Sequence, residues 1–374
     1  MSNWIPYGRQ SIDEYDIAAV AAVLKGDWLT TGPAVEEFEQ ALSEVAGAQT
    51  VAVSSGTAAL HAAYAAIDLG PGDEIIVPTM TFVATAAAAV HLGAGVRFVD
   101  VRDDTLNIDL EAIPDAVTAR TKAIVAVDYA GHPAEMDELN DIADTTGTTL
   151  ISDASHSLGA AYHNRPVGSL ADLTIFSFHP VKIITTGEGG AVAALKPEHV
   201  ESVRRFRNHG LVRDPAEHQI EGQGAWHQEV HEVGLNYRLP DPLAALGRSQ
   251  LKKLDSFVDR RTFLADRYNK ALADVDGIRL PVVVEGVEPA WHLYPIRVLV
   301  GRRREVFDHM RANDIGVQVH YLPVHMHPAF DGATPGSLPV AERAYDELLS
   351  LPLYPGMTDS EQDRVVAELD SALA

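Results

Sequence analysis

The most informative stretch of this sequence is Phe176-Ser177-Phe178-His179-Pro180-Val181-Lys182-Ile183-Ile184-Thr185-Thr186-Gly187-Glu188-Gly189-Gly190. Residues Leu173 to Phe178 are rich in β-branched and aromatic side chains, which predicts a strand. One lysine, Lys182, follows in a short loop between Pro180 and a glycine-rich turn. A partly buried lysine near other cations favours the neutral amine, which can attack a carbonyl. A surface lysine in a turn is the ordinary alternative, but the flanking residues favour the nucleophile.

Composition sets the broad class. The chain has 374 residues, of which 46% are hydrophobic, so two domains with a large core are expected. It contains no cysteine, which excludes disulfides and thiolate metal sites. The stretch Met1 to Asp13 is polar, and no segment has the roughly 20 apolar residues of a membrane span. We therefore expect a soluble, cytoplasmic protein that does not bind a membrane.

The composition of the chain is strongly acidic. The net charge is −24, and only seven of the 29 basic residues are lysines. Nucleic-acid binding through a basic face is therefore not expected. A hydrated, soluble surface explains this composition, and adaptation to a salt-rich cytoplasm is the sharper alternative.

A second informative stretch has the pattern of a phosphate site. Val51 to Val53 is a short apolar strand, and an alanine-rich helix reaches about Asp68 after the turn Ser54-Ser55-Gly56-Thr57-Ala58-Ala59-Leu60. The first amides of a helix lack partners and carry the positive end of its dipole, so they can bind an anion. A tight turn with a capped helix is the alternative.

Strands and helices alternate through the first two thirds of the chain. Further strands are expected at Glu74 to Pro78, Val96 to Val101 and Ala123 to Tyr129. This order predicts a mainly parallel sheet covered on both faces. The Rossmann and Walker glycine motifs are both absent from the sequence.

Helix signals accompany these strands. A helix is expected over Ser11 to Leu24 with Ser11 and Glu14 as a capping box, and another near Ala34 to Ala46. One long helix is expected from Asp241 to about Ala271. Strands are then expected at His292 to Val300 and Gly316 to His320, with helices near 303–313, 338–350 and 359–373.

Asp153 stands at the end of an apolar strand in Thr149-Leu150-Ile151-Ser152-Asp153-Ala154-Ser155-His156. Burying a carboxylate is costly without a cation. A protonated pyridine nitrogen is such a cation, and pairing with it keeps the ring an electron sink. A helix N-cap is the alternative role for Asp153.

The lysine segment resembles the Ser-Phe-His-x-x-Lys-x-x-Thr-x-Gly-Glu-Gly-Gly pattern of the DegT/DnrJ/EryC1/StrS sugar aminotransferases. The resemblance runs from Tyr7 to about Pro355 and implies pyridoxal 5'-phosphate as cofactor. It implies that Lys182 forms the Schiff base and that Asp153, 29 residues earlier, pairs with the pyridinium. His156 then bonds the ring's phenolic oxygen, and these three are the implied catalytic residues. The other implied cofactor contacts are Gly56, Thr57 and Ser177 at the phosphate, Phe82 on the ring, and Asn236 at the phosphate of a partner subunit.

The same resemblance suggests substrate contacts: Tyr7, Thr30, Thr31, Gly32, His179, Arg207, Arg238, His320 and Tyr321. Taken alone, Thr30 to Gly32 fit an ordinary helix–helix turn equally well, and solvated helix charges explain Arg207 slightly better. The segment 319–328 contains three histidines, but their uneven, proline-broken spacing and the lack of acidic companions argue against a metal. No metal is expected.

The resemblance implies an α/β fold of the aspartate aminotransferase type, PLP-dependent transferase fold type I. It has a large PLP-binding domain, residues 1–254, and a small α+β C-terminal domain, residues 255–374. It also implies a homodimer that shares its active sites between subunits.

The implied activity is a PLP-dependent nucleotide-sugar aminotransferase. It would move the amino group of L-glutamate to a nucleotide-linked 4-keto-6-deoxy sugar, taken as UDP-4-keto-6-deoxy-HexNAc. Family members that aminate the 4-position tend to have Phe-His in the lysine loop, as in Phe178-His179, whereas 3-position enzymes usually have Phe-Tyr. Three segments, 5–12, 26–33 and 128–133, resemble more closely the branch of UDP-4-amino-4,6-dideoxy-N-acetyl-β-L-altrosamine transaminases of the pseudaminic acid pathway.

Three alternatives stay open. One is an aminotransferase acting on another keto sugar or cyclitol, such as a 3-keto TDP-sugar or scyllo-inosose. A second is a family dehydratase, although those enzymes replace the lysine by histidine. The third is a non-catalytic PLP-binding regulator, which the retained Lys182 and Asp153 disfavour.

Overall fold

The structure, a computed structural model, describes residues 4–333 and 336–374. Its centre is a seven-stranded sheet in the order β1-β9-β8-β5-β4-β2-β3. The strands in that order are Gln49–Val53, Gly190–Ala194, Leu173–Ser177, Thr149–Asp153, Thr121–Val127, Glu74–Pro78 and Gly95–Val99. Only β9 runs against its neighbours, β1 and β8; the other pairs are parallel. The expected mainly parallel sheet is therefore confirmed.

Both faces of the sheet are covered, as the continuous apolar strands require. Along β4, Ala123 and Val125 belong to one core, and Ile124 and Ala126 belong to the other, because successive side chains point to opposite faces. The first core is closed by α3, α4 and α7, at Gly56–Ala66, Ala84–His91 and Pro197–Phe206. The second is closed mainly by α2, α6 and α8, at Pro33–Ala46, Met136–Thr146 and Asp241–Leu251. A short helix, α5, spans Ile113–Ala116.

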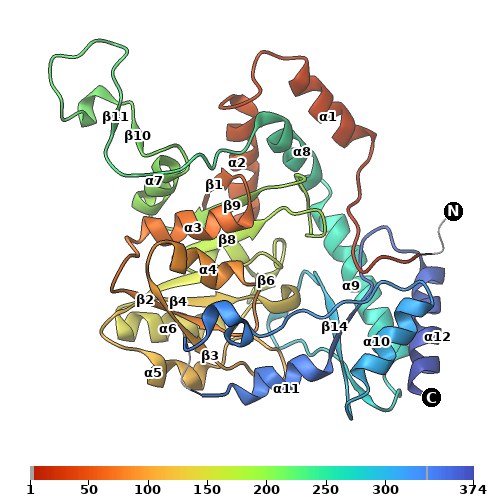
Figure 1. The fold of residues 1–374 in the computed structure, drawn as a ribbon. Coiled ribbons are helices and arrows are strands. Elements are labelled where there is room, and N and C mark those ends of the chain that lie inside the picture. Colours follow the sequence, from red (N-terminus) through yellow and green to blue (C-terminus); the bar gives the residue numbers. More distant parts are fainter. Residues whose placement is uncertain (1–3, 334–335) are drawn as a thin grey trace.

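A separate core lies toward the C-terminus, at the right of Figure 1. It packs α9, α10 and α12 (Leu254–Ala271, Arg303–Ala312, Asp359–Leu373) against the sheet β12-β14-β15. These strands are Ile278–Arg279, Tyr294–Val298 and Leu348–Leu351, and α11 (Pro339–Glu347) precedes β15. Ile5 also joins this core. The domain boundary between residues 254 and 255 stays a prediction.

Two small ribbons complete the described chain. One has the order β13-β6-β7, at Val287–Glu288, Ala161–Tyr162 and Arg165–Pro166. The other pairs β10 (Leu211–Val212) with β11 (Glu229–Val230) at the base of an excursion that projects from the body beyond α7 (Figure 1). Among the described residues, no helix has the length and apolar character needed to cross a lipid bilayer. Residues 1–3 of the polar N-terminal stretch lie outside the described residues.

The first expected helix is shorter than predicted. It is α1, Glu14–Leu24, and its capping box uses Asp13 and Asp16 instead of Ser11 and Glu14. Tertiary contacts explain the difference, because Asp16 is fully buried and accepts hydrogen bonds from Lys253 and Gln250. Burial of this ion pair fixes the cap at Asp13.

Three C-terminal predictions are also wrong in detail. The expected single helix from Asp241 to Ala271 breaks between α8 and α9, where Lys253 turns toward Asp13 and Asp16. The expected strand Gly316 to His320 is reduced to one isolated bridge from Gln318 to Ser350. The expected helix 338–350 ends at Glu347, because the next four residues are buried as β15 against β14.

Candidate active site

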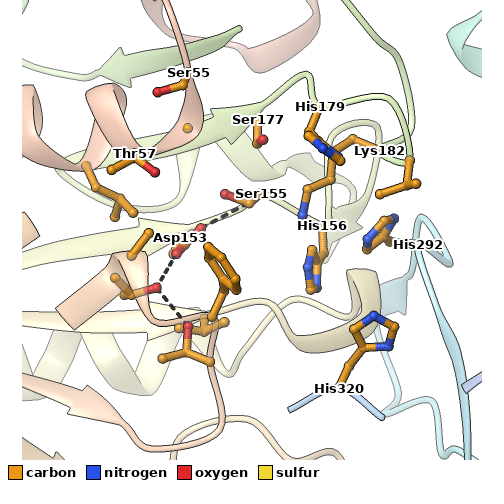
Figure 2. A pocket seen from close by; sticks show the side chains of 18 of the residues that line it. Ser55, Thr57, Asp153, Ser155, His156, Ser177, His179, Lys182, His292 and His320 are labelled. Carbon is orange, nitrogen blue, oxygen red and sulfur yellow. Dashed lines mark hydrogen bonds between the residues drawn. The ribbon is translucent and has the colours of Figure 1, made fainter. Parts of the chain in front are cut away.

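The carboxyl ends of β1, β5 and β8 meet at one edge of the sheet, where open α/β sheets bind ligands. A cavity of about 340 Å³ opens there. Figure 2 shows Ser55, Thr57 and Ser177 at one end of it and three histidines, His156, His292 and His320, at the other. Lys182 and Asp153 also line it.

The first end of the cavity is built by the N-terminus of α3. Ser55 is the N-cap, and its hydroxyl accepts a hydrogen bond from Ala58 N at 3.0 Å. A Cβ on Gly56 would lie 2.9 Å from the Cβ of Ser177, so only glycine lets the helix start approach the end of β8. Free backbone amides beside three hydroxyl side chains, those of Ser55, Thr57 and Ser177, make a phosphate cradle.

Gly190 explains the glycine-rich end of the lysine segment. It is the first residue of β9 and pairs with both Val53 and Ser177. A Cβ there would lie 2.4 Å from the carbonyl oxygen of Ser55. Through β9, which lies between β1 and β8, the motif brings the phosphate cradle after β1 close to the lysine loop after β8.

Lys182 is held in a loop that closes on itself. Phe178 N donates to Gly189 O at 2.9 Å, Thr186 N donates to Phe178 O at 3.0 Å, and Lys182 N donates to His179 O at 2.9 Å. Burial lowers the pKa of Lys182 to about 8, although the charge of Asp153 opposes this. At pH 7 about a tenth of the amines are then neutral, far more than for an ordinary lysine.

Asp153 ends β5 and is buried. Its Oδ2 accepts a hydrogen bond from Thr85 Oγ1 at 2.7 Å, and Oδ1 accepts one from Ser155 N at 3.2 Å. The Oγ1 atom of Thr85 in turn lies 2.8 Å from that of Thr81. These bonds orient the carboxylate toward the cavity and leave it able to pair with a cation.

The opposite wall is formed by histidines and a tyrosine. His156 Nε2 lies 3.1 Å from the hydroxyl of Tyr321, and the ring centroids of His156 and His292 are 4.3 Å apart. Burial, aided by the charge of Lys182, lowers the pKa of His320 to about 4 and that of His156 well below its usual range. These imidazoles are therefore neutral at neutral pH.

The expected substrate contact Tyr7 reaches the cavity from the N-terminal segment. Ile5 N donates to Asp314 O, and Leu353 N donates to Tyr7 O at 3.0 Å, so this segment is tied to the C-terminal core. The ring of Tyr7 lies 5.5 Å from that of His320. Phe82 also lines the cavity; it is 56% exposed, and its ring lies 6.0 Å from that of Tyr321.

The structure thus brings together eleven of the sequence-predicted residues at this cavity: Tyr7, Gly56, Thr57, Phe82, Asp153, His156, Ser177, His179, Lys182, His320 and Tyr321. The other six lie elsewhere in the chain. Thr31, Gly32, Arg207 and Arg238 line a second, arginine-rich groove, whereas Thr30 and Asn236 are exposed. Arg207 is committed to an ion pair with Glu39 and to Ala52 O.

Sequence reasoning missed four residues of the site. Thr81 and Thr85 orient Asp153, and their spacing of four on a helix start was the available signal. His292 lines the cavity, but its place before a buried strand suggested only core. Asp128, which follows β4, accepts a hydrogen bond from Ser157 and so anchors the segment that carries His156. Burial raises the pKa of Asp128 to about 7.

Pyridoxal phosphate fits the residues present. The cradle of Ser55, Gly56 and Thr57 is suited to its phosphate, Asp153 to its protonated ring nitrogen, and Lys182 to its aldehyde. Moreover, Nδ1 of His156 is buried without a hydrogen-bond partner among the described residues. A half-buried lysine with lowered pKa, in one cavity with a carboxylate and a phosphate cradle, is typical of a PLP-dependent enzyme.

The family follows from comparison with known proteins. Residues 10–370 match the model of the DegT/DnrJ/EryC1/StrS aminotransferase family, and this chain belongs to that family. It is 37% identical over 374 residues to the spore coat polysaccharide biosynthesis protein SpsC of Bacillus subtilis, covering 98% of this chain and 96% of SpsC.

Solved structures agree. Helicobacter pylori PseC, an aminotransferase involved in pseudaminic acid biosynthesis, superposes with a TM-score of 0.93 at 30% identity, covering 99% of both chains. The putative sugar aminotransferase Spr1654 of Streptococcus pneumoniae, in its PMP form, gives the same score, identity and coverage. Spr1654 is also known in a PLP form. The predicted fold type I, the family and the PLP cofactor are confirmed, and the protein is a sugar aminotransferase.

Proposed function

We propose that this protein transfers the amino group of L-glutamate to the 4-position of a nucleotide-linked 4-keto-6-deoxy sugar, UDP-4-keto-6-deoxy-HexNAc. The observation that carries the aminotransferase chemistry is that Lys182, half-buried and with a lowered pKa, lines one cavity with Asp153 and the phosphate cradle. When bound, pyridoxal phosphate supplies an aldehyde for the amino group and a ring that takes up electrons from the reacting carbon.

Lys182 is the proton carrier in this proposal. Its amine, neutral more often than that of an ordinary lysine, takes a proton from the substrate carbon and returns it on the other side of the transfer. The neutral imidazoles of His156 and His320 add no positive charge against the protonated amine. Because the pKa values of both imidazoles lie below that of Lys182, they are weaker proton acceptors, and the proton transfer is assigned to Lys182.

The other residues of the cavity position the cofactor and protect it from water. Asp153 holds a ring nitrogen protonated, because Thr85 and Ser155 keep the carboxylate in place. The hydroxyl groups of Thr57 and Ser177 bind phosphate at the start of α3. Phe82, exposed above the cavity, covers the ring and excludes water.

The regiochemistry rests on two supports. His179 lines the cavity, and Phe-His is typical of family members that aminate the 4-position. The overlap with PseC, itself named for pseudaminic acid biosynthesis, favours the same sugar class. An imidazole at His179 presents a different donor to the sugar than a phenol does.

We further propose that the enzyme is a homodimer whose active sites are shared. Asn236, Thr30 and Thr31 are exposed in one chain and lie outside its own cavity. In a symmetric dimer such residues can complete the site of the partner. Arg238, on the arginine-rich groove, would then contact the partner's substrate.

The test is product analysis by NMR after reaction with glutamate. One sample contains UDP-4-keto-6-deoxy-HexNAc, and the other contains a TDP-linked 3-keto sugar. We expect amination of the 4-keto sugar. Amination of the 3-keto sugar alone would overturn the regiochemistry and leave the chemistry of Lys182 intact, whereas failure with every keto sugar would contradict the proposed substrate class.

A further inference from the structure

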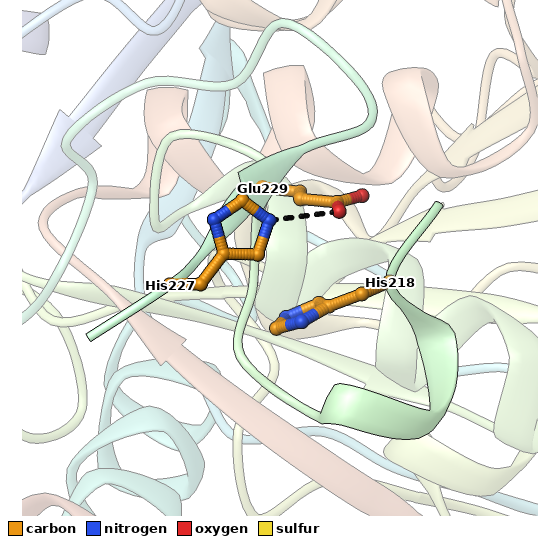
Figure 3. A group of neighbouring side chains, drawn as sticks. All are labelled: His218, His227 and Glu229. Carbon is orange, nitrogen blue, oxygen red and sulfur yellow. Dashed lines mark hydrogen bonds and ion pairs between the residues drawn. The ribbon is translucent and has the colours of Figure 1, made fainter. Parts of the chain in front are cut away.

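We propose that His218, His227 and Glu229 form a binding site for a divalent transition metal of the zinc class. The site is far along the chain from the catalytic residues, in the excursion between β10 and β11. Its three ligand atoms lie within 4.8 Å of one another (Figure 3). It is independent of the sugar proposed as substrate.

The site joins the two arms of the excursion. His218 follows the single turn Pro215–Glu217 on the outgoing arm, whereas His227 and Glu229 lie on the returning arm. Because side chains two apart in an extended segment share a face, His227 and Glu229 point the same way. The Nε2 atom of His227 is 3.0 Å from Oε1 of Glu229.

Hydrogen bonding alone explains most of this cluster. Glu229 is buried, and its carboxylate accepts hydrogen bonds from the backbone N–H groups of Gln219 and Ile220, both at 2.8 Å. His231 lies 2.7 Å from its Oε2, on the edge away from His227. With these four hydrogen-bond partners, the carboxylate of Glu229 forms a hydrogen-bonded node that holds the two arms of the excursion together without any metal.

His218 is the residue that this hydrogen-bonded node leaves unexplained. Its Nε2 atom is buried and has no hydrogen-bond partner within the described chain. Its ring stands edge-on to that of His227, with centroids 4.8 Å apart. A buried polar atom without a partner is costly, and a metal ion between the two rings and the carboxylate would satisfy it.

The donor set indicates the kind of metal. Two imidazoles and one carboxylate suit Zn²⁺, which leaves a fourth position for water in a tetrahedral site. The bond lengths of about 2.0–2.2 Å require the three side chains to close in slightly on the ion. The expected effect is to lock the two arms together. This proposal departs from the expectation of no metal, which considered only the histidines of segment 319–328.

The first measurement is the amount of zinc that the holoenzyme binds in equilibrium dialysis. The second is the protection of segment 213–228 from proteolysis when zinc is present. We expect one zinc per chain at the excursion and slower cleavage there. The key variant is His218→Phe, which keeps a ring against His227 but removes the nitrogen ligand. It should weaken zinc binding by more than about tenfold and abolish the protection.

A variant outside the cluster serves as the control. His91→Ala removes an exposed histidine of α4 and should bind zinc as the wild type does. His320→Ala tests whether zinc binds in the catalytic cavity instead. Equal zinc binding by His218→Phe and wild type, or loss of zinc only in His320→Ala, would overturn the proposal, as would a wild type that takes up no zinc.

Discussion

Lys182 lies among groups that act on its proton in opposite directions. Burial favours the neutral amine, whereas the carboxylate of Asp153 favours the ammonium, and burial is the larger effect. The neighbouring imidazoles of His156 and His320 are neutral, so they leave this balance to the carboxylate. The reactivity of this amine is therefore set by its burial and by the charge of Asp153, and the charge can be removed by mutation.

The first prediction concerns pH. Without cofactor, Lys182 should combine with added pyridoxal phosphate at a rate that rises with pH through about 8, because only the neutral amine attacks. Asp153→Asn removes the charge that stabilises the ammonium, so its midpoint should move to lower pH. The measurement is the rate of appearance of the visible absorption band. Lys182→Ala is the control and should show no covalent adduct. A midpoint that rises in Asp153→Asn would contradict the assignment.

The second prediction concerns catalysis by Asp153. Asp153→Asn should still bind the cofactor, because the phosphate cradle is untouched, but a neutral amide no longer holds the ring nitrogen protonated. We expect kcat to fall by about 1,000-fold, a barrier increase of about 4 kcal/mol. Thr85→Val, which removes the hydroxyl on Oδ2, should show a smaller loss in the same direction. Activity near wild type in Asp153→Asn would remove Asp153 from the site.

At the scale of elements, the close approach of β9 to the start of α3 sets the site's geometry, which leads to the third prediction. Gly190→Ala places a Cβ 2.4 Å from Ser55 O, against backbone that cannot move cheaply. Overpacking of this kind costs about 1–3 kcal/mol. The melting temperature and the affinity for pyridoxal phosphate should both fall. Gly70→Ala is the matched control, because no atom lies within 4 Å of the added Cβ. A Gly190→Ala protein that behaves like Gly70→Ala would show that the contact is unimportant.

Elements with strong local signals were predicted well from the sequence. Strand β2 and helix α12 have the expected bounds, and most other large-sheet strands differ by a few residues. Elements whose bounds depend on residues distant in the sequence were predicted poorly. The segment Leu348 to Leu351 favours a helix locally, but it is buried as strand β15 beside β14. The break between α8 and α9 contains no proline or glycine that would have predicted it. Tertiary pairing overrides propensity at both places.

The site shows the same division. Lys182, Asp153 and Ser177 carry motifs, and all three line the cavity. His292 carries none, because its importance depends on which residues lie opposite it after folding. Whether Asn236 meets a cofactor depends on a second chain, and one chain's sequence cannot place it.

At the scale of the whole molecule, charge is the dominant feature, and the fourth prediction follows from it. Because the net charge is −24, the acidic side chains repel one another in the folded state, and salt screens that repulsion. Salt also weakens exposed ion pairs such as those of Asp103 with Arg279 and Arg343. Because acidic residues outnumber basic ones by 53 to 29, we expect the first effect to exceed the second. The melting temperature should therefore rise with potassium chloride. A melting temperature that stays flat or falls as salt is raised to ~1 M, where the screening length is about 3 Å, would count against salt adaptation.

The fifth prediction tests the shared active site. Asn236 is exposed and does not line its own cavity, so Asn236→Ala should fold normally and yet lose activity if its side chain serves the partner. Lys182→Ala loses activity in its own cavity. In a mixed dimer of the two variants, the cavity with an intact Lys182 receives an intact Asn236 from the other subunit, while the second cavity lacks both. Half the dimers in an equal mixture are mixed, so unfolding and refolding the two variants together should restore about a quarter of wild-type activity. The same variants refolded separately and then combined are the control. If the mixture only matches that control, or if the enzyme is fully active as a dilute monomer, each chain holds a complete site and Asn236 has another role.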